Sequence, residues 1–213
     1  MVDFKADPAR TALINVDIQN CFVENSPIAS PDGPAVLRRI NRFIGSCRQL
    51  GTKIIHTAHI LRPGYTNIGV LAEVEPVVKT GLLDEGSFSA ALHKDLDVKP
   101  DDIVLYKPRY GAFHGTDLEL VLRSNGIDSV VISGIATNVC CETTAREANA
   151  RDFRVFFLAD GTATFGMQGL TAEELQRATL ANIAALFGEV LTIDQMVAKL
   201  RAGAASRPAH AAE

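Results

Sequence analysis

The sequence predicts one α/β domain built on a parallel sheet that helices cover on both faces. Short apolar runs alternate with longer segments of helical periodicity, which is typical of strand–helix–strand units. The runs are apolar almost throughout, as in strands that are buried on both faces. The chain has 213 residues, of which 47% are hydrophobic, enough for one complete core. Parallel strands are joined by right-handed crossovers, so the sheet is expected to be doubly wound.

The pattern predicts six strands and five helices, in the order that such a sheet requires. The apolar runs that predict strands are 11–17, 53–58, 102–106, 130–132, 153–159 and 189–191. The segments that predict helices are 32–50, 116–125, 139–150, 171–187 and 192–201. Three of the helices begin with a Thr-x-x-Glu or Thr-x-x-Gln sequence, at Thr116, Thr171 and Thr192, which predicts a capping box at each.

The predicted domain comprises residues 11–201. Residues 1–10 form a polar N-terminal lead-in, and residues 202–213, which are rich in Ala and Pro, are expected to be a disordered tail. Residues 61–100 are the least regular part of the domain, and several glycines interrupt them. Long insertions of this kind are usually functional loops or interface elements, so this segment either walls a pocket or contacts another subunit.

The composition argues against several classes of function. The formal net charge of −4 at pH 7 is unfavourable for binding nucleic acid or an anionic membrane surface. No apolar run reaches membrane-spanning length and the first residues lack the order of a signal peptide, so a cytoplasmic protein is expected. The cysteines, Cys21, Cys47, Cys140 and Cys141, have no zinc-site spacing, and a disulfide framework does not suit a reducing compartment. No metal and no other cofactor is predicted.

The stretch VVISGIATNVCCETTAREANA, residues 130–150, carries the clearest chemical signal. It predicts a buried strand, a tight turn at residues 133–138, and a helix whose first turn contains Cys140. Backbone N–H groups at a helix N-terminus favour negative charge, so a thiol there is expected to have a lowered pKa and to act as a nucleophile. The same N–H groups can stabilise an oxyanion when the sulfur attacks a carbonyl group. The stretch therefore predicts a hydrolase.

Two adjacent cysteines compete for this role. Cys141, Ala145 and Ala148 share one helix face, and this stripe of small residues suits close packing against a sheet. Cys140 lies on the more polar face, nearer the turn. Free cysteines are among the most buried residue types, so packing is the ordinary alternative for either one. The position in the strand–turn–helix segment favours Cys140 as the nucleophile and Cys141 as a core residue.

Two further polar residues follow predicted strands at their carboxyl ends. Asp17 ends the first strand and Lys107 ends the third. Ligands of open α/β sheets bind at this edge, and a buried carboxylate must be paired or functional. A surface aspartate entering a loop and a solvated lysine are the ordinary alternatives. The alternation of strands and helices nevertheless places Asp17, Lys107 and the Cys140 turn at one edge of the sheet.

His56 and His59 raise the question of a metal site. Residues three apart on a strand point to opposite faces, so one ion does not easily take both. The neighbouring residues supply no carboxylate. We therefore expect no metal, and we expect His56 to be an interior or interface histidine.

Three motifs resemble a known family. They are ALINVDIQNCFV at Ala12–Val23, KPRYGAFHGTDL at Lys107–Leu118, and SGIATNVCCETTAREA at Ser133–Ala148. Together they are similar to the isochorismatase-like cysteine hydrolases, over about residues 10–200. The resemblance implies a Rossmann-like three-layer αβα fold with a parallel six-stranded sheet. It also implies a homo-oligomer, either a dimer or a tetramer.

The resemblance also implies the roles of individual residues. By match of motif the catalytic triad is Asp17, Lys107 and Cys140. A cis peptide bond is implied between Ile135 and Ala136, which turns the Ala136 N–H towards the site. The N–H groups of Ala136 and Cys140 then form the oxyanion hole.

Three departures from the family pattern bear on the substrate. Cys21 stands where family members often have Asp, close to the triad aspartate in sequence but outside the triad. Nicotinamidase-type members carry an Asp-x-His metal pair after the second strand, whereas this chain has Thr57–Ile60 with the sequence TAHI. This difference argues against nicotinamide and against a metal. Members that cleave isochorismate lack the cysteine, so Cys140 favours cleavage of a C–N bond.

These observations predict a cysteine-dependent hydrolase that cleaves a small amide or N-carbamoyl compound through a thioester. The aromatic residues on loops at the catalytic edge are expected to wall the substrate pocket, although each is as well suited to the core; they are Phe22, Tyr110, Phe113 and Phe165. The alternatives are a vinyl-ether hydrolase with Asp17 as the acid, a catalytically silent binding protein, and a redox protein that uses Cys140 and Cys141. Adjacent cysteines form a disulfide only with strained geometry, which disfavours the redox alternative.

Overall fold

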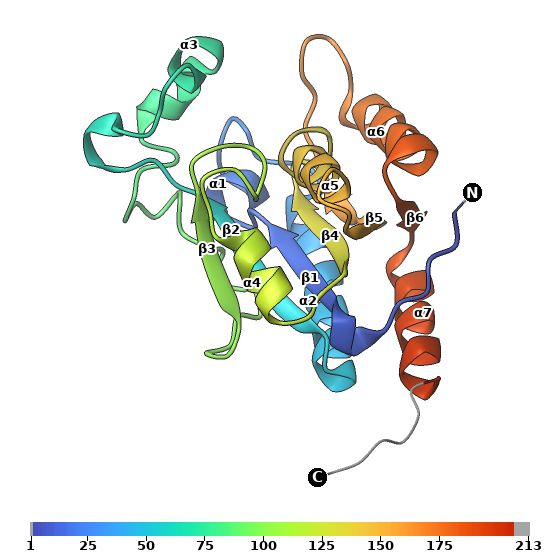
Figure 1. Ribbon diagram of the computed structural model, residues 1–213. Helices are drawn as coiled ribbons and strands as arrows, with labels where there is room; N and C mark the ends of the chain where they lie inside the picture. Colours follow the sequence, from blue (N-terminus) through green and yellow to red (C-terminus); the bar gives the residue numbers. More distant parts are fainter. Residues whose placement is uncertain (1, 207–213) are drawn as a thin grey trace.

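The computed structural model describes residues 2–206, and these form a six-stranded parallel sheet with helices on both faces (Figure 1). The strand order is β3-β2-β1-β4-β5-β6, and every neighbouring pair is parallel. The strands are β1 (Thr11–Val16), β2 (Lys53–His59), β3 (Ile103–Lys107), β4 (Ser129–Ile135), β5 (Arg154–Ala163) and β6 (Glu189–Leu191). The predicted fold class is confirmed. The order reverses between β1 and β4, where ligands bind in sheets of this type.

The helices form two layers. The longer ones are α2 (Gly33–Leu50), α4 (Leu118–Ser124), α5 (Glu142–Asn149), α6 (Ala172–Leu186) and α7 (Ile193–Ala205). The short ones are α1 (Asn20–Val23), α3 (Leu71–Val74), the 3₁₀ turns η1 (Pro8–Arg10), η2 (Pro63–Tyr65) and η3 (Pro76–Thr80), and one π-helical turn, η4 (Thr137–Cys141). Helices α2 and α7 pack in one core with one face of the sheet, and α4, α5 and α6 pack in a second core with the other face.

Helix α2 shows how the sequence pattern produces this layering. Its buried residues, including Val36, Ile40 and Phe43, recur at helical spacing and form one apolar stripe against the sheet. The helix ends at Gly51, which has φ 74° and donates its N–H to Cys47 and Arg48 carbonyl oxygens as a C-cap. The prediction from the sequence is confirmed for this element.

Two of the three predicted capping boxes form. The hydroxyl groups of Thr171 and Thr192 each accept a hydrogen bond from the backbone N–H three residues later. The side chain of that later residue in turn accepts a hydrogen bond from the threonine N–H. At Thr116 the prediction is wrong, because α4 starts one residue later, with Asp117 as N-cap and no side-chain cap bond. The Glu119 side chain, which would complete the box, instead accepts a hydrogen bond from Arg151 at 3.0 Å.

Strands β4 and β5 continue further than their apolar runs suggest. β4 extends to Ile135 and β5 to Ala163, and these two residues are paired in the sheet. A register shift between Ile132 and Gly134 permits this extension. The turn expected at residue 133 and the loop expected from Gly161 therefore begin later, because pairing with the neighbouring strand overrides the local glycine signal.

The C-terminal helix is also longer than expected. Helix α7 continues to Ala205, so the expectation of disorder from residue 202 is wrong for its first four residues. A Cβ atom at Gly203 would lie 1.7 Å from the carbonyl oxygen of Ala6, so glycine lets this helix end pack closely against the N-terminal segment. The rest of the predicted tail, 207–213, lies outside the described residues.

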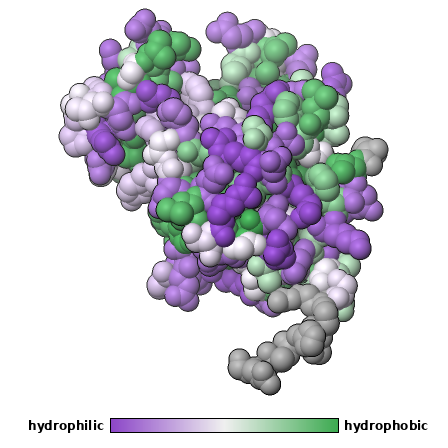
Figure 2. All heavy atoms as spheres, in the orientation of Figure 1, coloured by the Kyte–Doolittle hydropathy of each residue, from purple (hydrophilic) through white to green (hydrophobic). Residues whose placement is uncertain are grey.

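The irregular segment 61–100 forms a lobe that stands away from the sheet next to β2 and β3, with α3 at its far end (Figure 1). The lobe surface at α3 includes a hydrophobic region (Figure 2), where Val70 and Val74 are 64% and 72% exposed. Within residues 2–206, no helix is long and apolar enough to cross a bilayer.

Candidate active site

Asp17 follows the last residue of β1 and is completely buried. Its backbone has φ 52°, a left-handed conformation that is uncommon for a residue other than glycine. Thr57 of the neighbouring strand β2 makes two hydrogen bonds with Asp17. The Asp17 N–H donates to the Thr57 carbonyl oxygen at 3.1 Å, and the Thr57 hydroxyl donates to Asp17 Oδ1 at 2.7 Å. One carboxylate oxygen is thus anchored, and Oδ2 is directed to other partners.

Lys107, the last residue of β3, supplies the partner of Oδ2. Its Nζ lies 2.7 Å from Asp17 Oδ2 and donates to the carbonyl oxygens of Arg109 at 2.8 Å and Tyr110 at 2.9 Å. The ammonium group thus has two carbonyl acceptors and one carboxylate counter-ion. Burial by itself disfavours the charged form, but the Asp17 carboxylate and the Cys140 sulfur outweigh it and raise the pKa of Lys107. Lys107 is therefore a buried cation.

Cys140 lies in the π-helical turn η4 between β4 and α5, and its side chain is buried. Besides burial, the charges of Asp17 and Lys107 both act on its thiol: Lys107 lowers the pKa of Cys140 and Asp17 raises it. The structure therefore brings together the three residues that the sequence placed at one edge of the sheet. They come from the ends of β1, β3 and β4, which are far apart in the chain.

The protonation state of Cys140 differs from the expectation. Burial is the largest effect and raises the pKa of the thiol; Lys107 lowers it and Asp17 raises it again, and the resulting pKa is about 12. The lowered pKa predicted from the strand–turn–helix pattern is therefore wrong for the unliganded site. A group with this pKa is a neutral thiol at neutral pH, so it needs a base before it can attack.

Cys141 points into the second core. It is fully buried, belongs to the same cluster as Ala145 and Ala148, and its pKa is raised well above the usual value because of burial. The predicted stripe of small residues on this helix face is thus observed.

The backbone ahead of Cys140 has the predicted cis peptide bond, between Ile135 and Ala136. The Ala136 carbonyl oxygen accepts the N–H groups of Val139 at 3.2 Å and Cys141 at 3.1 Å. Ala136 and Cys140 themselves both line the cavity next to the triad.

This cavity, of about 300 Å³, opens onto Cys140. Phe22, Tyr110 and Phe165, predicted as pocket walls, all line it. The lining residues that the sequence analysis did not single out as pocket walls are Ile28, His59, Glu75, Val77, Val78, Leu83, Val139, Met167 and Gln168. Several of these come from the lobe of residues 61–100, so this segment walls the pocket, one of the two roles expected for it.

The prediction that Phe113 walls the pocket is wrong. Its ring packs against Phe153 with the centroids 5.9 Å apart, within the second core, and it does not line the cavity. The loop turns inward here because α5 holds its backbone: the Ala112 N–H donates to Thr144 Oγ1 at 3.1 Å, and the Phe113 N–H donates to Glu147 Oε2 at 3.0 Å. The aromatic ring is therefore carried into the core.

The two histidines have separate surroundings. His56 is buried between Asn15 and Asp102, with Nε2 3.2 Å from the Asp102 carboxylate. His59 lines the cavity; burial, followed by the charge of Lys107, lowers its pKa to about 3, so it is neutral. Within residues 2–206, no group of three or more His, Cys, Asp or Glu side chains is arranged to hold a metal ion.

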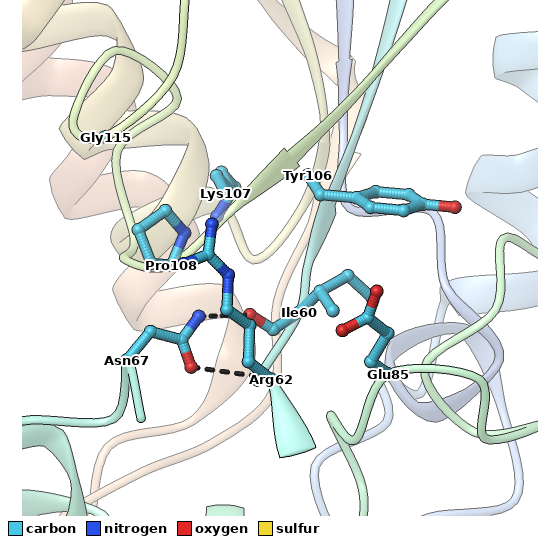
Figure 3. A pocket seen from close by; sticks show the side chains of 8 residues that line it. All are labelled: Ile60, Arg62, Asn67, Glu85, Tyr106, Lys107, Pro108 and Gly115. Carbon is cyan, nitrogen blue, oxygen red and sulfur yellow. Dashed lines mark hydrogen bonds between the residues drawn. The ribbon is translucent and has the colours of Figure 1, made fainter. Parts of the chain in front are cut away.

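A second hollow lies on the outer side of β3 (Figure 3). Asn67 lies at one side of it, hydrogen-bonded to the Arg62 N–H at 2.9 Å and to the Ile60 carbonyl oxygen at 3.0 Å, and Tyr106 lies at the other side. Lys107 and Tyr106 of β3 line this hollow, whereas Asp17 and Cys140 do not. It shares no lining residue with the cavity at Cys140.

Comparisons with known proteins identify the family of this chain. The isochorismatase domain family matches residues 11–195. The chain is 36% identical to the ureidoacrylate amidohydrolase RutB of Methylobacterium radiotolerans, over 86% of this chain and 77% of that protein. It is 34% identical to nicotinamidase 3 of Arabidopsis thaliana, over 90% of each. A solved cysteine hydrolase from Pseudomonas syringae pv. phaseolicola has TM-score 0.90 and 30% identity, over 95% of this chain and 97% of that one. The resemblance of the three motifs is confirmed, and the chain belongs to the isochorismatase family.

Proposed function

We propose that this protein is a cysteine amidohydrolase that cleaves a C–N bond of a small amide or N-carbamoyl compound and releases ammonia or an amine. The observation that carries the proposal is the buried ion pair of Asp17 and Lys107, whose charges both act on the Cys140 thiol, beside a cavity of about 300 Å³ that Cys140 lines. Relatives named as a ureidoacrylate amidohydrolase and a nicotinamidase support the reaction class.

In the first step, Asp17 acts as the general base for Cys140. Because the pKa of the thiol is about 12, the sulfur attacks as its proton moves to the Asp17 carboxylate, whose charge already acts on it. Lys107 contacts both groups, so a positive charge stays next to the sulfur as negative charge develops there. The Thr57 hydroxyl holds the other carboxylate oxygen in position.

The attack places negative charge on the carbonyl oxygen of the substrate. The N–H groups of Ala136 and Cys140 are the proposed donors, since both residues line the cavity beside the sulfur. Loss of one such donor typically lowers the rate by about 10²–10³-fold.

In the second half of the reaction, Asp17 returns its proton to the leaving nitrogen. A water molecule then enters, Asp17 takes its proton, and the resulting nucleophile opens the thioester and regenerates the thiol. The C–N bond is broken and a C–O bond is formed, so the products are a carboxylic or carbamic acid and ammonia or an amine.

The alternatives fit the site less well. A vinyl-ether hydrolase or a silent binding protein would leave the contacts of Cys140 with Asp17 and Lys107 without a role, and the amidohydrolase names of the relatives do not favour either.

The test compares Cys140→Ser with Cys141→Ser on a panel of small amides, with ammonia release as the readout. We expect the Cys140 variant to lose at least about 10³-fold in kcat/KM, since removing a nucleophile costs more than removing an oxyanion donor. The Cys141 variant, altered only in the core, should retain turnover. Intact-protein mass spectrometry of the wild type should show an acyl adduct that Cys140→Ser lacks. Abolished turnover in the Cys141 variant with turnover spared in the Cys140 variant would contradict the assignment.

We also propose that the protein is a cytoplasmic homo-oligomer, a dimer or a tetramer. β3 is an edge strand in the described sheet, and its side chains Val104 and Tyr106 are 40% and 62% exposed. A second copy of the chain would cover them. The four cysteines are free and buried, as suits a reducing compartment. Light scattering of wild type and Tyr106→Glu tests the assembly, and a monomeric wild type would contradict it.

A further inference from the structure

The catalytic cavity has an unusual balance of charge for a site that binds small polar molecules. Among the residues that line it, Glu75 is the one with a formal charge at neutral pH. His59 is neutral because its pKa is about 3, and Cys140 is neutral because its pKa is about 12. Most of the remaining lining consists of aliphatic and aromatic side chains. The cavity therefore offers apolar surface and one negative charge.

Lys107 does not provide a counter-ion for a bound anion. Its Nζ donates to the carbonyl oxygens of Arg109 at 2.8 Å and Tyr110 at 2.9 Å, and it forms an ion pair with Asp17 Oδ2 at 2.7 Å. The charge of Asp17 already balances it, and both side chains are fully buried. A carboxylate on the substrate would have to displace one of these acceptors.

Arg109 is the next cation along the chain, and it is also engaged. Its guanidinium donates to the carbonyl oxygens of Asn67 and Pro108, both at 2.6 Å. These bonds join the loop after β3 to the lobe of residues 61–100, and Arg109 does not line the cavity.

Glu75 lies where the lobe meets the cavity, between α3 and η3. It is exposed, and no ion pair or side-chain hydrogen bond engages it in the described part of the chain. Its carboxylate nevertheless acts on the interior: after burial and the Cys140 sulfur, its charge contributes to raising the pKa of Tyr110, another wall of the cavity. Glu75 is thus an unpaired negative charge at the rim.

We infer that this site selects amides whose acyl or carbamoyl group is uncharged and apolar, in contrast to the carboxylate-bearing ureidoacrylate for which the RutB relatives are named, and that Glu75 is a specificity-determining residue that disfavours carboxylate-bearing substrates. The inference rests on the proposed function, because it concerns the same cavity. A carboxylate brought into an apolar cavity loses its hydration without gaining a cation, and it also meets a like charge. An apolar group of the same shape pays neither cost and buries its surface against the walls.

A matched pair of amides tests this directly. 4-Methylpentanamide and succinamate have nearly the same length and shape beyond the amide, but only succinamate ends in a carboxylate. We expect the wild-type kcat/KM, from ammonia release, to be at least about 100-fold higher for 4-methylpentanamide. Glu75→Lys supplies a cation at the rim and should narrow this ratio at least about tenfold. Glu73→Lys, two residues away in α3 and outside the cavity lining, makes the same charge change and should leave the ratio as it is.

Binding separates this inference from the proposed chemistry. The dissociation constants of both amides for Cys140→Ala, which cannot turn them over, are measured by NMR titration. Tighter binding of 4-methylpentanamide, weakened selectivity in Glu75→Lys and unchanged selectivity in Glu73→Lys support the inference even if ammonia release fails. Equal or tighter binding of succinamate, or no binding of 4-methylpentanamide, overturns it. Ammonia release from succinamate in that case would leave the amidohydrolase proposal standing.

Discussion

The substitution Lys107→Met removes the cation from the centre of the site while keeping most of the side-chain volume. The Asp17 carboxylate then remains fully buried without its 2.7 Å partner, and the carbonyl oxygens of Arg109 and Tyr110 lose their donor. Removing one member of a buried ion pair typically costs about 3–5 kcal/mol, because an uncompensated charge stays behind. We expect the free energy of unfolding of Lys107→Met to fall by this amount.

A double-mutant cycle isolates the cause. Asp17→Asn alone should also destabilise the protein, since it leaves the ammonium without its anion. The double variant Asp17→Asn/Lys107→Met has no buried charge at this point, so its loss should be smaller than the sum of the single losses by at least about 2 kcal/mol. Urea denaturation followed by circular dichroism at pH 7 measures all four proteins.

A surface lysine provides the control. Lys94 forms an exposed ion pair with Asp95 at 2.8 Å, and Lys94→Met should leave the free energy of unfolding nearly unchanged. The reasoning is refuted if Lys107→Met costs less than about 1 kcal/mol, or if the two single losses simply add in the double variant.

Three further predictions concern the backbone, the pH dependence and the pocket. Gly134 has φ 131°, and a Cβ atom there would lie 2.0 Å from a carbonyl oxygen of β1. Gly134→Ala should therefore lower the free energy of unfolding by about 3–5 kcal/mol, measured by urea denaturation. The control Gly45→Ala, in open space on α2, should raise it by about 0.5–1 kcal/mol. The pKa of His59 is about 6.5 in the unfolded chain and about 3 in the folded protein, so at pH 5 the imidazole is protonated in the unfolded chain alone. The free energy of unfolding should therefore fall by about 2 kcal/mol between pH 6.5 and pH 5. His59→Gln should lose that part of the pH dependence, and an unchanged slope would contradict the assigned pKa. Phe113→Leu should lower the melting temperature and leave KM unchanged, because Phe113 packs in the core, whereas Phe165→Leu should change KM, because Phe165 lines the cavity. A changed KM in Phe113→Leu with an unchanged KM in Phe165→Leu would contradict these assignments.

The parts of the fold that the sequence predicts well are those that local patterns decide. The apolar stripe of α2, its glycine C-cap at Gly51 and the boxes at Thr171 and Thr192 need only neighbouring residues, and all form. The box at Thr116 fails because Arg151, distant in sequence, engages Glu119.

The site, too, combines features that local sequence patterns predict with features that depend on distant residues. Strand ends were enough to place Asp17, Lys107 and Cys140 at one edge, because parallel strands share their direction. The pKa of Cys140 was predicted in the wrong direction, because burial depends on how the whole domain closes over the sulfur. Glu75 carried no local signal, since its position beside the cavity depends on how the lobe of residues 61–100 docks.

The protonated resting state of Cys140 has a consequence for the durability of the enzyme. Because burial raises the pKa of Cys140 to about 12, nearly all of this thiol is protonated at pH 7. Hydrogen peroxide reacts with the ionised form, so this sulfur is a poor target for sulfenic acid formation. If Cys140 is the nucleophile proposed above, we expect peroxide to inactivate this protein more slowly than an enzyme whose cysteine is permanently ionised.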